Sequence, residues 1–328
     1  MNQRRHCLIG LFAAAGAVGR PWAQSPPRLP RIGILSNASP HPAMPGSIEA
    51  LIAGLRERGY VDGRTVQIEF RWAEGRSERL PELAADLVAR QVDVIIATGD
   101  APTRAAKAAT GTIPIVMSSS GDAVGAGFVA SLARPGANVT GMTAMNPELG
   151  AKRLQLLHEL VPRATRIAVT WNPEDRAHVL NLQSLQAAAP QLALSLLPTA
   201  IARADALDGL IEHLLRSQVA ALVVLHDTII FSVQERILQF AAQRRLPAMY
   251  EAREWAVAGG LVSYGVTHAD LFRQSASHVD RILKGARPAD LPVEQPTLVR
   301  LTVNQRTAKT LGLTVPPSIL VRADEVIE

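Results

Sequence analysis

The 328-residue sequence contains one cysteine, Cys7, which lies in an N-terminal segment that reads as an export signal. In residues 1–23, Arg4 and Arg5 precede a short apolar run, and Ala23 provides a small residue where cleavage is expected. Once this segment is removed, the chain has no thiol and therefore no disulfide. We expect an exported protein whose stability comes from its hydrophobic core alone.

Long apolar runs are also missing from the rest of the chain. No segment after residue 23 offers the roughly 18 or more uninterrupted apolar residues that a transmembrane helix needs, so no stable membrane insertion is expected after cleavage. The formal charge of +5 falls to +2 when Arg4, Arg5 and Arg20 are removed with the signal. Because the remaining basic residues are scattered among acids, a nucleic-acid partner is not expected. The sequence predicts a monomer in the periplasm, exported by the general secretory or the twin-arginine route.

Motifs that carry catalysis or bind cofactors are absent from the sequence. There is no G-x-S-x-G elbow, no G-x-x-x-x-G-K-[ST] loop and no dinucleotide fingerprint after the first predicted strand. The eight histidines show no metal-ligand spacing, and His158, His178, His213 and His278 fall in amphipathic helical patterns, where we expect them at the surface or its boundary. The sequence therefore predicts no enzyme, no metal site and no cofactor.

A regular alternation of apolar strands and amphipathic helices runs from Arg31 onward. The first series predicts strands at 31–35, 65–72, 92–97 and 113–117, with helices at 47–58, 81–90 and 101–109. The second predicts helices at 148–161, 176–189, 203–216 and 230–245, with strands at 166–171, 192–197, 220–225 and 247–249. Such alternation is typical of an α/β fold, here two doubly wound parallel-sheet lobes.

The boundaries of the two lobes follow from where this alternation restarts. We predict a first lobe of residues 30–142 plus about 262–290, and a second lobe of about 143–261. The chain would cross between the lobes at 138–146 and return at 260–265, which makes a hinge with several crossings. The segment 291–328 contains a predicted strand and a short helix, and the sequence leaves open which lobe receives it.

Polar side chains recur just after the predicted strands, where the carboxyl ends of parallel strands face a ligand. The predicted ligand-binding residues are Ser36, Asn37, Thr98, Ser118, Asp122, Asn172, Asp227, Tyr250 and Tyr264. Each has a structural alternative, such as a helix cap at Asp227, a turn at Asn172 or packing at Tyr264. Their coincidence predicts a ligand site at the junction of the lobes, closed by hinge motion.

Several stretches resemble a known family: ERGYVDGRTVQIEFRWAEG, GAGFVASLARPGANVTG, GGLVSYG, ILKGARPADLPVEQPT, and TAKTLGL followed by RADEVIE. From about Arg31 to Glu328 the chain resembles ABC-transporter substrate-binding proteins related to the tryptophan-binding TrpX type, with a type I periplasmic-binding-protein fold. The resemblance implies capture of a small solute, an amino acid or related small carboxylate, and its delivery to an inner-membrane permease. A periplasmic sensor for a membrane signalling partner, or an enzyme, are the alternatives.

Two residues depart from the pattern of that family. Ala123 stands where proline is usual, and Asp100 stands where the family usually has a neutral or hydroxylic residue, which implies a changed preference for ligand charge. For an amino-acid ligand, we predict that Asp227 holds the ammonium group while Ser118 and Thr98 take the carboxylate. Asp122 competes as the anchor, although its position before a glycine-rich turn equally favours a helix cap.

Overall fold

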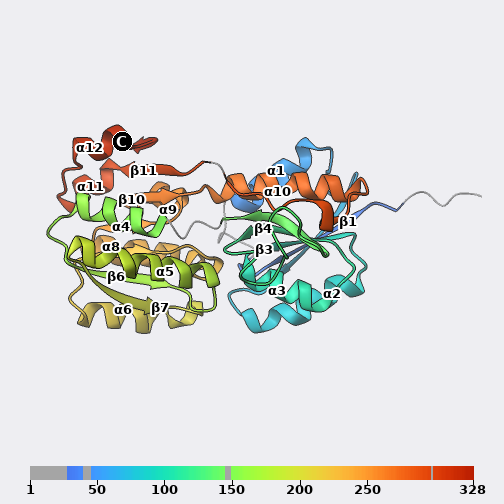
Figure 1. The fold of residues 1–328 in the computed structure, drawn as a ribbon, viewed down its shortest axis with the longest axis horizontal. Coiled ribbons are helices and arrows are strands. Elements are labelled where there is room, and N and C mark those ends of the chain that lie inside the picture. The colour runs from blue at the N-terminus through green and yellow to red at the C-terminus, as the bar shows by residue number, and fades with distance from the viewer. Residues whose placement is uncertain (1–27, 40–45, 145–148, 297) are drawn as a thin grey trace, which may run out of the picture.

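A computed structural model describes residues 28–39, 46–144, 149–296 and 298–328, and it shows two α/β lobes side by side (Figure 1). The fold predicted from the sequence, two lobes of the type I periplasmic-binding-protein kind, is confirmed. The predicted signal, residues 1–23, lies outside the described residues. Across the described ranges no helix combines the length and apolar character needed to cross a membrane.

The first lobe is a five-stranded parallel sheet in the order β2-β1-β3-β4-β5. Its strands are β1 Arg31–Ser36, β2 Gln67–Trp72, β3 Val94–Thr98, β4 Ile115–Ser120 and β5 Val139–Thr143. Its helices are α1 Ser47–Glu57, the 3₁₀ turn η1 Ser77–Arg79, α2 Leu80–Ala89, α3 Asp100–Ala109 and, from much later in the chain, α10 His268–Leu283. Helices α1 and α10 cover one face of the sheet, and α2 and α3 cover the other (Figure 1).

The continuous apolar sequence of β3 follows from this double cover. Val94 and Ile96 belong to the buried cluster that includes Leu51 of α1, whereas Ile95 and Ala97 belong to the cluster around α2. Side chains of a strand point alternately to opposite faces, so a strand with helices on both faces must be apolar at every position. This is why the parallel sheet could be predicted from composition.

The second lobe is a seven-stranded sheet in the order β12-β11-β10-β9-β8-β6-β7. Its strands are β6 Arg166–Trp171, β7 Ser195–Ala200, β8 Ala221–Val224, β9 Ala248–Tyr250, β10 Val262–Gly265, β11 Arg300–Asn304 and β12 Glu325–Ile327. Its helices are α4 Leu149–Leu160, α5 Arg176–Ala188, α6 Leu207–Arg216, α7 Thr228–Ser232, α8 Gln234–Gln243, α9 Arg253–Val257, α11 Gln305–Leu311 and α12 Pro317–Arg322. The 3₁₀ turns η2 Ala189–Leu192 and η3 Ala204–Ala206 precede β7 and α6.

Both predicted crossings between the lobes contain a strand. Residues 139–143 form β5 at the edge of the first sheet, and residues 262–265 form β10, which pairs with β9 in the second sheet. The predicted start of the returning segment at about 262 is therefore wrong, because the chain leaves the second sheet only after Gly265. Short strands next to a hinge carry the same glycine-rich sequence as a connection, so composition did not separate them.

The C-terminal segment divides between the lobes. Pro288–Asp290 forms the 3₁₀ turn η4, and the backbone N–H of Glu294 then donates to the carbonyl of Gly141 in the first lobe at 2.9 Å. β11 enters the second sheet antiparallel to β10. The direction follows from connectivity, since β10 runs toward the first lobe and β11 comes back from it. The sheet of the second lobe is consequently mixed rather than purely parallel.

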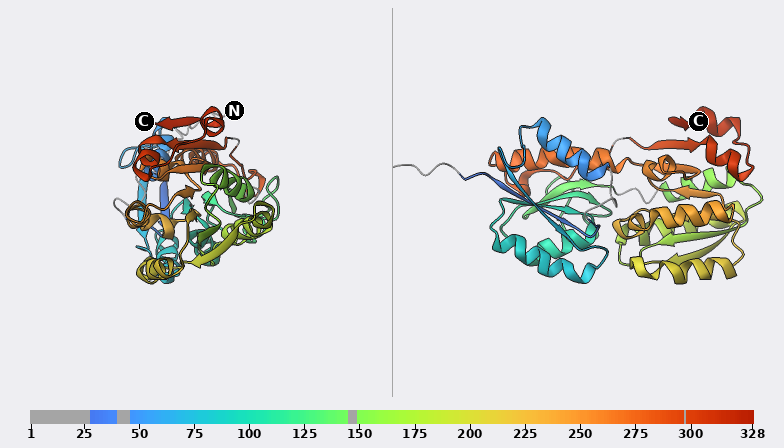
Figure 2. Two further views of the ribbon diagram at one scale, coloured as in Figure 1. Left: turned by 90° about the vertical axis from the view of Figure 1, so that its left-hand side faces the viewer. Right: turned by 180° about the vertical axis from the view of Figure 1, so that it is seen from behind.

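The predicted helix 230–245 is interrupted. α7 ends at Ser232 and α8 begins at Gln234, with Val233 between them at φ −112° and ψ 18°. The break separates α7, whose N-cap is Asp227, from α8, which lies along the sheet of the second lobe (Figure 2). The amphipathic pattern alone favours one helix because both pieces bury residues of the same cluster, including Phe231 and Ile237.

Candidate functional site

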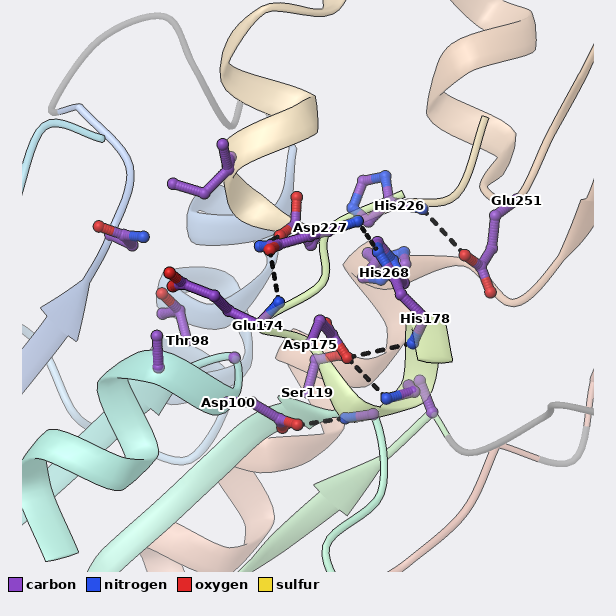
Figure 3. Close-up of a pocket in the computed structure, with 18 of the residues that line it drawn as sticks. Thr98, Asp100, Ser119, Glu174, Asp175, His178, His226, Asp227, Glu251 and His268 are labelled. Atoms are coloured by element: carbon purple, nitrogen blue, oxygen red, sulfur yellow. Dashed lines mark hydrogen bonds between the residues drawn. The ribbon is translucent and has the colours of Figure 1, made fainter. Parts of the chain in front are cut away.

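A cavity lies between the lobes, at the carboxyl ends of strands from both sheets (Figure 3). Thr98 and Asp100 line it from the first lobe, and Asn172, Asp227 and Glu251 line it from the second. The space inside its walls is about 960 Å³, part of which is open to solvent. This is the position at which open α/β sheets bind ligands, and its walls come from both halves of the molecule.

Two predicted site residues of the first lobe line this cavity. Thr98 is fully buried, and its Oγ1 donates to Oγ of Ser36 at 2.8 Å. Asn37 donates from Nδ2 to Oγ of Ser77 at 2.9 Å, and its buried Oδ1 has no hydrogen-bond partner within the described part of the chain. Asn37 therefore presents an acceptor that a ligand donor can use.

Two predicted residues of the second lobe line the opposite wall. Asp227 caps α7, because its Oδ1 accepts the N–H of Ile230 at 2.7 Å, and its Oδ2 accepts from Nδ2 of Asn172. Oδ1 of Asn172 accepts the N–H of Glu174 at 3.0 Å, which closes a turn. The structural alternatives for both residues are thus observed, while both side chains also face the cavity.

Five predicted residues are not among those that line the cavity: Ser36, Ser118, Asp122, Tyr250 and Tyr264. Ser36 lies behind Thr98, and Oγ of Ser118 approaches the carbonyl of Ala97 at 3.3 Å, while the next residue, Ser119, lines the cavity. Neighbouring residues of a strand face opposite ways, and β4 shifts register between Met117 and Ser120. The shift makes the facing serine hard to choose from sequence.

Asp122 lies at the edge of the interlobe contact rather than in the cavity wall. Its Oδ1 accepts the N–H of Gly125 at 2.7 Å, but residues 123–127 form turns and no helix follows, so the predicted helix cap is wrong. Its Oδ2 lies 3.4 Å from Nε of Arg176. Arg176 begins α5 in the second lobe. This ion pair therefore joins the lobes.

The two predicted tyrosines have roles in packing. Tyr250 is 1% exposed and stacks on Trp255 with ring centroids 5.0 Å apart, and burial raises the pKa of its hydroxyl. Tyr264 is half-buried against the core of the second lobe, and its backbone carbonyl accepts from Nε of Arg153 at 2.7 Å. Of these two residues, Tyr264 contributes to the site indirectly, by holding Arg153.

Arg153 and Glu251 form a buried ion pair in the cavity wall. Glu251 directly follows a strand, but Arg153 lies within a helix, so the pattern of polar residues after strands indicates only Glu251. Arg153 is 1% exposed, and one of its Nη atoms lies 3.1 Å from Oε1 of Glu251. The other Nη donates to Oδ1 of Asn181 at 3.0 Å. Burial opposes the ionised form of Glu251 and is the largest effect, but Arg153, together with His178, His268 and the backbone N–H of His226, holds the pKa of Glu251 below its usual value. The two charges compensate each other, and the ion pair joins α4 to the residue that follows β9.

Histidines contribute more to the interior than the sequence suggests. His178 and His278 are 1% and 0% exposed, so the expectation that they lie at the surface is wrong for both, whereas His213 is exposed. Helix α5 turns its His178 side toward the cavity because its N-terminus abuts the first lobe. His178 accepts the N–H of Asn172 at Nδ1, at 2.9 Å. Amphipathic periodicity could not reveal this, since it reports a buried face but not a neighbouring lobe.

Two further histidines and a phenylalanine form a mainly apolar part of the wall. The rings of His226 and His268 lie 3.9 Å apart between centroids, and Nε1 of Trp255 donates to Nδ1 of His226 at 3.0 Å. Burial lowers the pKa of both histidines, which keeps the rings neutral. Phe272 lines the cavity beside them. His226 and His268 lie just beyond β8 and β10, so the strand-end pattern would have included them.

Asp175, His178 and Asp227 carry possible metal-ligand atoms within 4.8 Å of one another. However, Nδ1 of His178 accepts a backbone N–H, so the ring proton of the neutral form is on Nε2 and no free lone pair remains for a metal. Burial opposes the charged form of His178 and is the largest effect, but Asp175, Asp227 and Glu251, with the backbone of His226, together raise its pKa. The chemistry of this cluster does not fit a metal centre.

The lobes touch directly beside the cavity, so the arrangement is closed. A Cβ added to Gly121, after β4, would lie 2.3 Å from Cβ of Ala177 in α5. Such a distance leaves no room for any side chain at residue 121. Glycine at this position allows the turn after β4 to meet the first turn of α5, next to the ion pair of Asp122 with Arg176.

The model of the family described as ABC transporter substrate binding protein matches residues 31–327. The chain is 27% identical to a tyrosine-binding protein of Clostridioides difficile over 282 residues, which are 86% of this chain and 81% of that protein. It resembles the crystal structure of an ABC domain in complex with L-Trp from Streptococcus pneumoniae, at 27% identity and a TM-score of 0.83, over 92% of this chain and 100% of the other.

A conserved domain protein from Vibrio cholerae is 26% identical with a TM-score of 0.84, over 91% of this chain and 100% of the other. The likeness thus extends over nearly the whole chain in sequence and in structure, and the resemblance predicted from the sequence is confirmed. The chain belongs to the family of ABC transporter substrate-binding proteins.

Proposed function

We propose that this protein is the periplasmic solute-binding component of an ABC importer, which captures an amino acid or related small carboxylate between its lobes and delivers it to an inner-membrane permease. The observation that carries the proposal is the cavity whose wall is shared by strand ends of both lobes. Neither lobe alone encloses a ligand, so binding and closure are coupled. A permease can then distinguish the closed, loaded form from the open one.

The wall chemistry supports an amino acid with a bulky, flat side chain. Phe272 and the neutral rings of His226 and His268 offer surfaces on which an aromatic ring can stack, next to Val266 and Ile229. The carboxylates and amides at the strand ends suit the polar end of the same molecule. The names of two relatives, a tyrosine-binding protein and a domain in complex with L-Trp, agree with this class of ligand.

We propose a binding role without catalysis, exercised by a monomer after export. In the cavity wall His178 and His226 each use Nδ1 as an acceptor for a protein N–H, which leaves neither nitrogen free to act as a general base on a ligand. Export is tested by mass spectrometry of the periplasmic product, which is expected to begin near Gln24. A full-length chain that is found only in the cytoplasm would contradict the proposed location.

The ligand class is tested by a thermal-shift screen over the twenty L-amino acids, followed by calorimetry. A ligand at 100 times its Kd stabilises the folded state by about 2.7 kcal/mol, which is well resolved. We expect L-tryptophan or L-tyrosine to raise the melting temperature more than L-alanine or L-glutamate does. Uniformly absent shifts would rule out the amino-acid class.

A further inference from the structure

Two carboxylates from opposite lobes line the cavity next to Gly121. Asp100 begins α3 in the first lobe, and Asp175 caps α5 in the second (Figure 3). Gly121 connects them: its N–H donates to Oδ1 of Asp100 at 3.1 Å, and a Cβ built on it would lie 3.0 Å from Oδ1 of Asp175. Both side chains line the cavity.

Asp100 is left with an unused oxygen in a buried position. The residue is 6% exposed, and its Oδ1 takes both available donors, Oγ of Ser120 at 2.7 Å and the N–H of Gly121. Its Oδ2 is buried and has no hydrogen-bond partner within the described ranges. An ionised carboxylate in such a position costs free energy unless a donor or a cation reaches it.

The protein itself supplies little compensating charge here. Among the described residues that line the cavity, Arg153 is the one lysine or arginine, and it is paired with Glu251. Asp100, Glu174, Asp175 and Asp227 therefore have no permanently charged partner in the wall; Arg104 of α3 acts on Asp100 from outside the wall, and His178 lies next to Asp175 and Asp227. The excess of carboxylates in the wall therefore favours a positively charged group of the ligand.

We propose that Asp100 and Asp175 together bind a protonated primary amine of the ligand, which bridges the two lobes. The identification of the amine as part of an amino acid rests on the proposed function. An ammonium group offers three donors and no acceptor, so it can reach Oδ2 of Asp100 and a carboxylate oxygen of Asp175 at once. We therefore assign the ammonium anchor to Asp100 and Asp175 rather than to Asp227, because both carboxylate oxygens of Asp227 already accept hydrogen bonds.

A ligand amine bound between the two carboxylates would also favour closure of the lobes. Without a cation the two carboxylates repel each other across the closing interface, and with one they attract it from both sides. A ligand amine would thus remove the main electrostatic obstacle to closure. The source of the amine is either the α-ammonium group of a zwitterion or an amine on a ligand side chain, and the two present the same chemistry to Asp100.

The test is calorimetry at pH 7.5 with matched probes. L-tryptophan carries both end groups, tryptamine carries the amine alone, and 3-indolepropionate carries the carboxylate alone; L-tyrosine, tyramine and 3-(4-hydroxyphenyl)propionate form a second set. We expect the probes with an amine to bind and the deaminated probes to bind about 30-fold or more weakly. Nα-acetyl-L-tryptophan should lose binding if the α-amine is the bridge. A bridge from a side-chain amine instead predicts that L-lysine binding survives Nα-acetylation but not Nε-acetylation.

The residue assignment is tested by Asp100→Asn, which keeps an acceptor for Ser120 and Gly121. We expect it to weaken the amine probes by about 30-fold or more and to leave the deaminated probes unweakened. Asp290→Asn is the matched control, since Asp290 is exposed in η4 and pairs with Arg287 away from the cavity. If Asp100→Asn does not fold, Asp175→Asn is measured with the same probes and the same expectation.

The outcomes separate the inference from the proposed function. Binding of L-tryptophan or L-tyrosine that stays within about threefold in the Asp100 and Asp175 variants would overturn the bridge and leave the amino-acid function standing. Binding of tryptamine or tyramine that depends on Asp100, with no binding of any amino acid, would support the bridge and reject the amino-acid class. If neither amines nor amino acids bind the wild-type protein, the bridge is overturned as well.

Discussion

Asp100 makes the folded protein respond to pH in a direction opposite to that of a salt-bridged carboxylate. Burial, and then the nearby charge of Asp175, raise its pKa from the usual 3.8 to about 6, while Ser120, Gly121 and Arg104 oppose the rise. Between these two values the folded state holds a proton that the unfolded state has lost. Stability without ligand therefore falls as pH rises through this window and stays lower above it.

This gives a prediction for Asp100→Asn in the absence of ligand. A rise of about two pKa units in the closed arrangement corresponds to about 3 kcal/mol at most, and opening of the lobes relieves part of it, so the variant should gain on the order of 1 kcal/mol relative to wild type between pH 4 and pH 7. Urea denaturation at these two pH values measures the difference. An identical pH slope in both proteins would show that Asp100 titrates normally.

Asp227 provides a second prediction at the scale of the residue. The sequence predicts it as the ammonium anchor, in which case Asp227→Asn would cost about 2 to 5 kcal/mol of binding. The geometry favours a smaller loss than in Asp100→Asn, because Asp227 already caps α7 and accepts from Asn172. Asparagine can keep the cap on Ile230 with its Oδ1, but its Nδ2 then meets the Nδ2 donor of Asn172, so we expect a loss of stability on the order of 1 kcal/mol. Calorimetry with L-tryptophan on both variants ranks the two anchors.

The site residues differ in how far the sequence could reveal them. Polar side chains after strands identified Asn37, Thr98, Asn172 and Asp227, because the carboxyl ends of parallel strands must share one edge. Ser118 and Ser119 show the limit of that rule, since a register shift decides which of them faces the cavity. Arg153 and His178 lie inside helices, and only the packing of whole elements brings them to the site.

At the scale of elements, the contact between the turn after β4 and the start of α5 determines whether the lobes can close. Gly121→Ala places a methyl group 2.3 Å from Cβ of Ala177, a distance that real Cβ atoms do not tolerate. We expect the variant to remain folded, because each lobe has its own sheet, and to bind L-tryptophan at least about tenfold more weakly. Gly111→Ala is the control, since nothing lies within 4 Å of its added Cβ.

Calorimetry checks this effect, and unchanged affinity in Gly121→Ala would mean that the closed contact is not needed for binding.

Helices and strands could be predicted from the sequence where the periodic pattern was long, but not near the hinge. The strands covered on both faces were recognisable as apolar runs, whereas β10 and β5 share their short, glycine-containing sequence with the connections around them. The antiparallel direction of β11 depends on the path of the chain between the lobes, which no local pattern encodes.

At the scale of the whole molecule, the chain passes between the lobes three times, after β5, after β10 and before β11. Several short connections permit a hinge motion while keeping each lobe rigid. In the closed arrangement Asp122 and Arg176 attract across the interface, whereas Asp100 and Asp175 repel. Asp122 is buried but Arg176 is half exposed, so water screens part of this attraction, and we expect the repulsion between the buried carboxylates to decide the balance when no cation is bound.

The balance between open and closed forms should therefore depend on ligand and on the charge of Asp100. Small-angle scattering of the wild-type protein at pH 7.5 is expected to show a larger radius of gyration without ligand than with saturating L-tryptophan. Without ligand, Asp100→Asn at pH 7.5, and the wild type at pH 5 where Asp100 is largely protonated, should both shift toward the compact form. The control Asp290→Asn should behave as wild type. The contrary outcome is that Asp100→Asn and wild type start from the same radius of gyration and are compacted equally by L-tryptophan. The hinge would then close without help from this carboxylate pair, and solvent would relieve the repulsion across the interface.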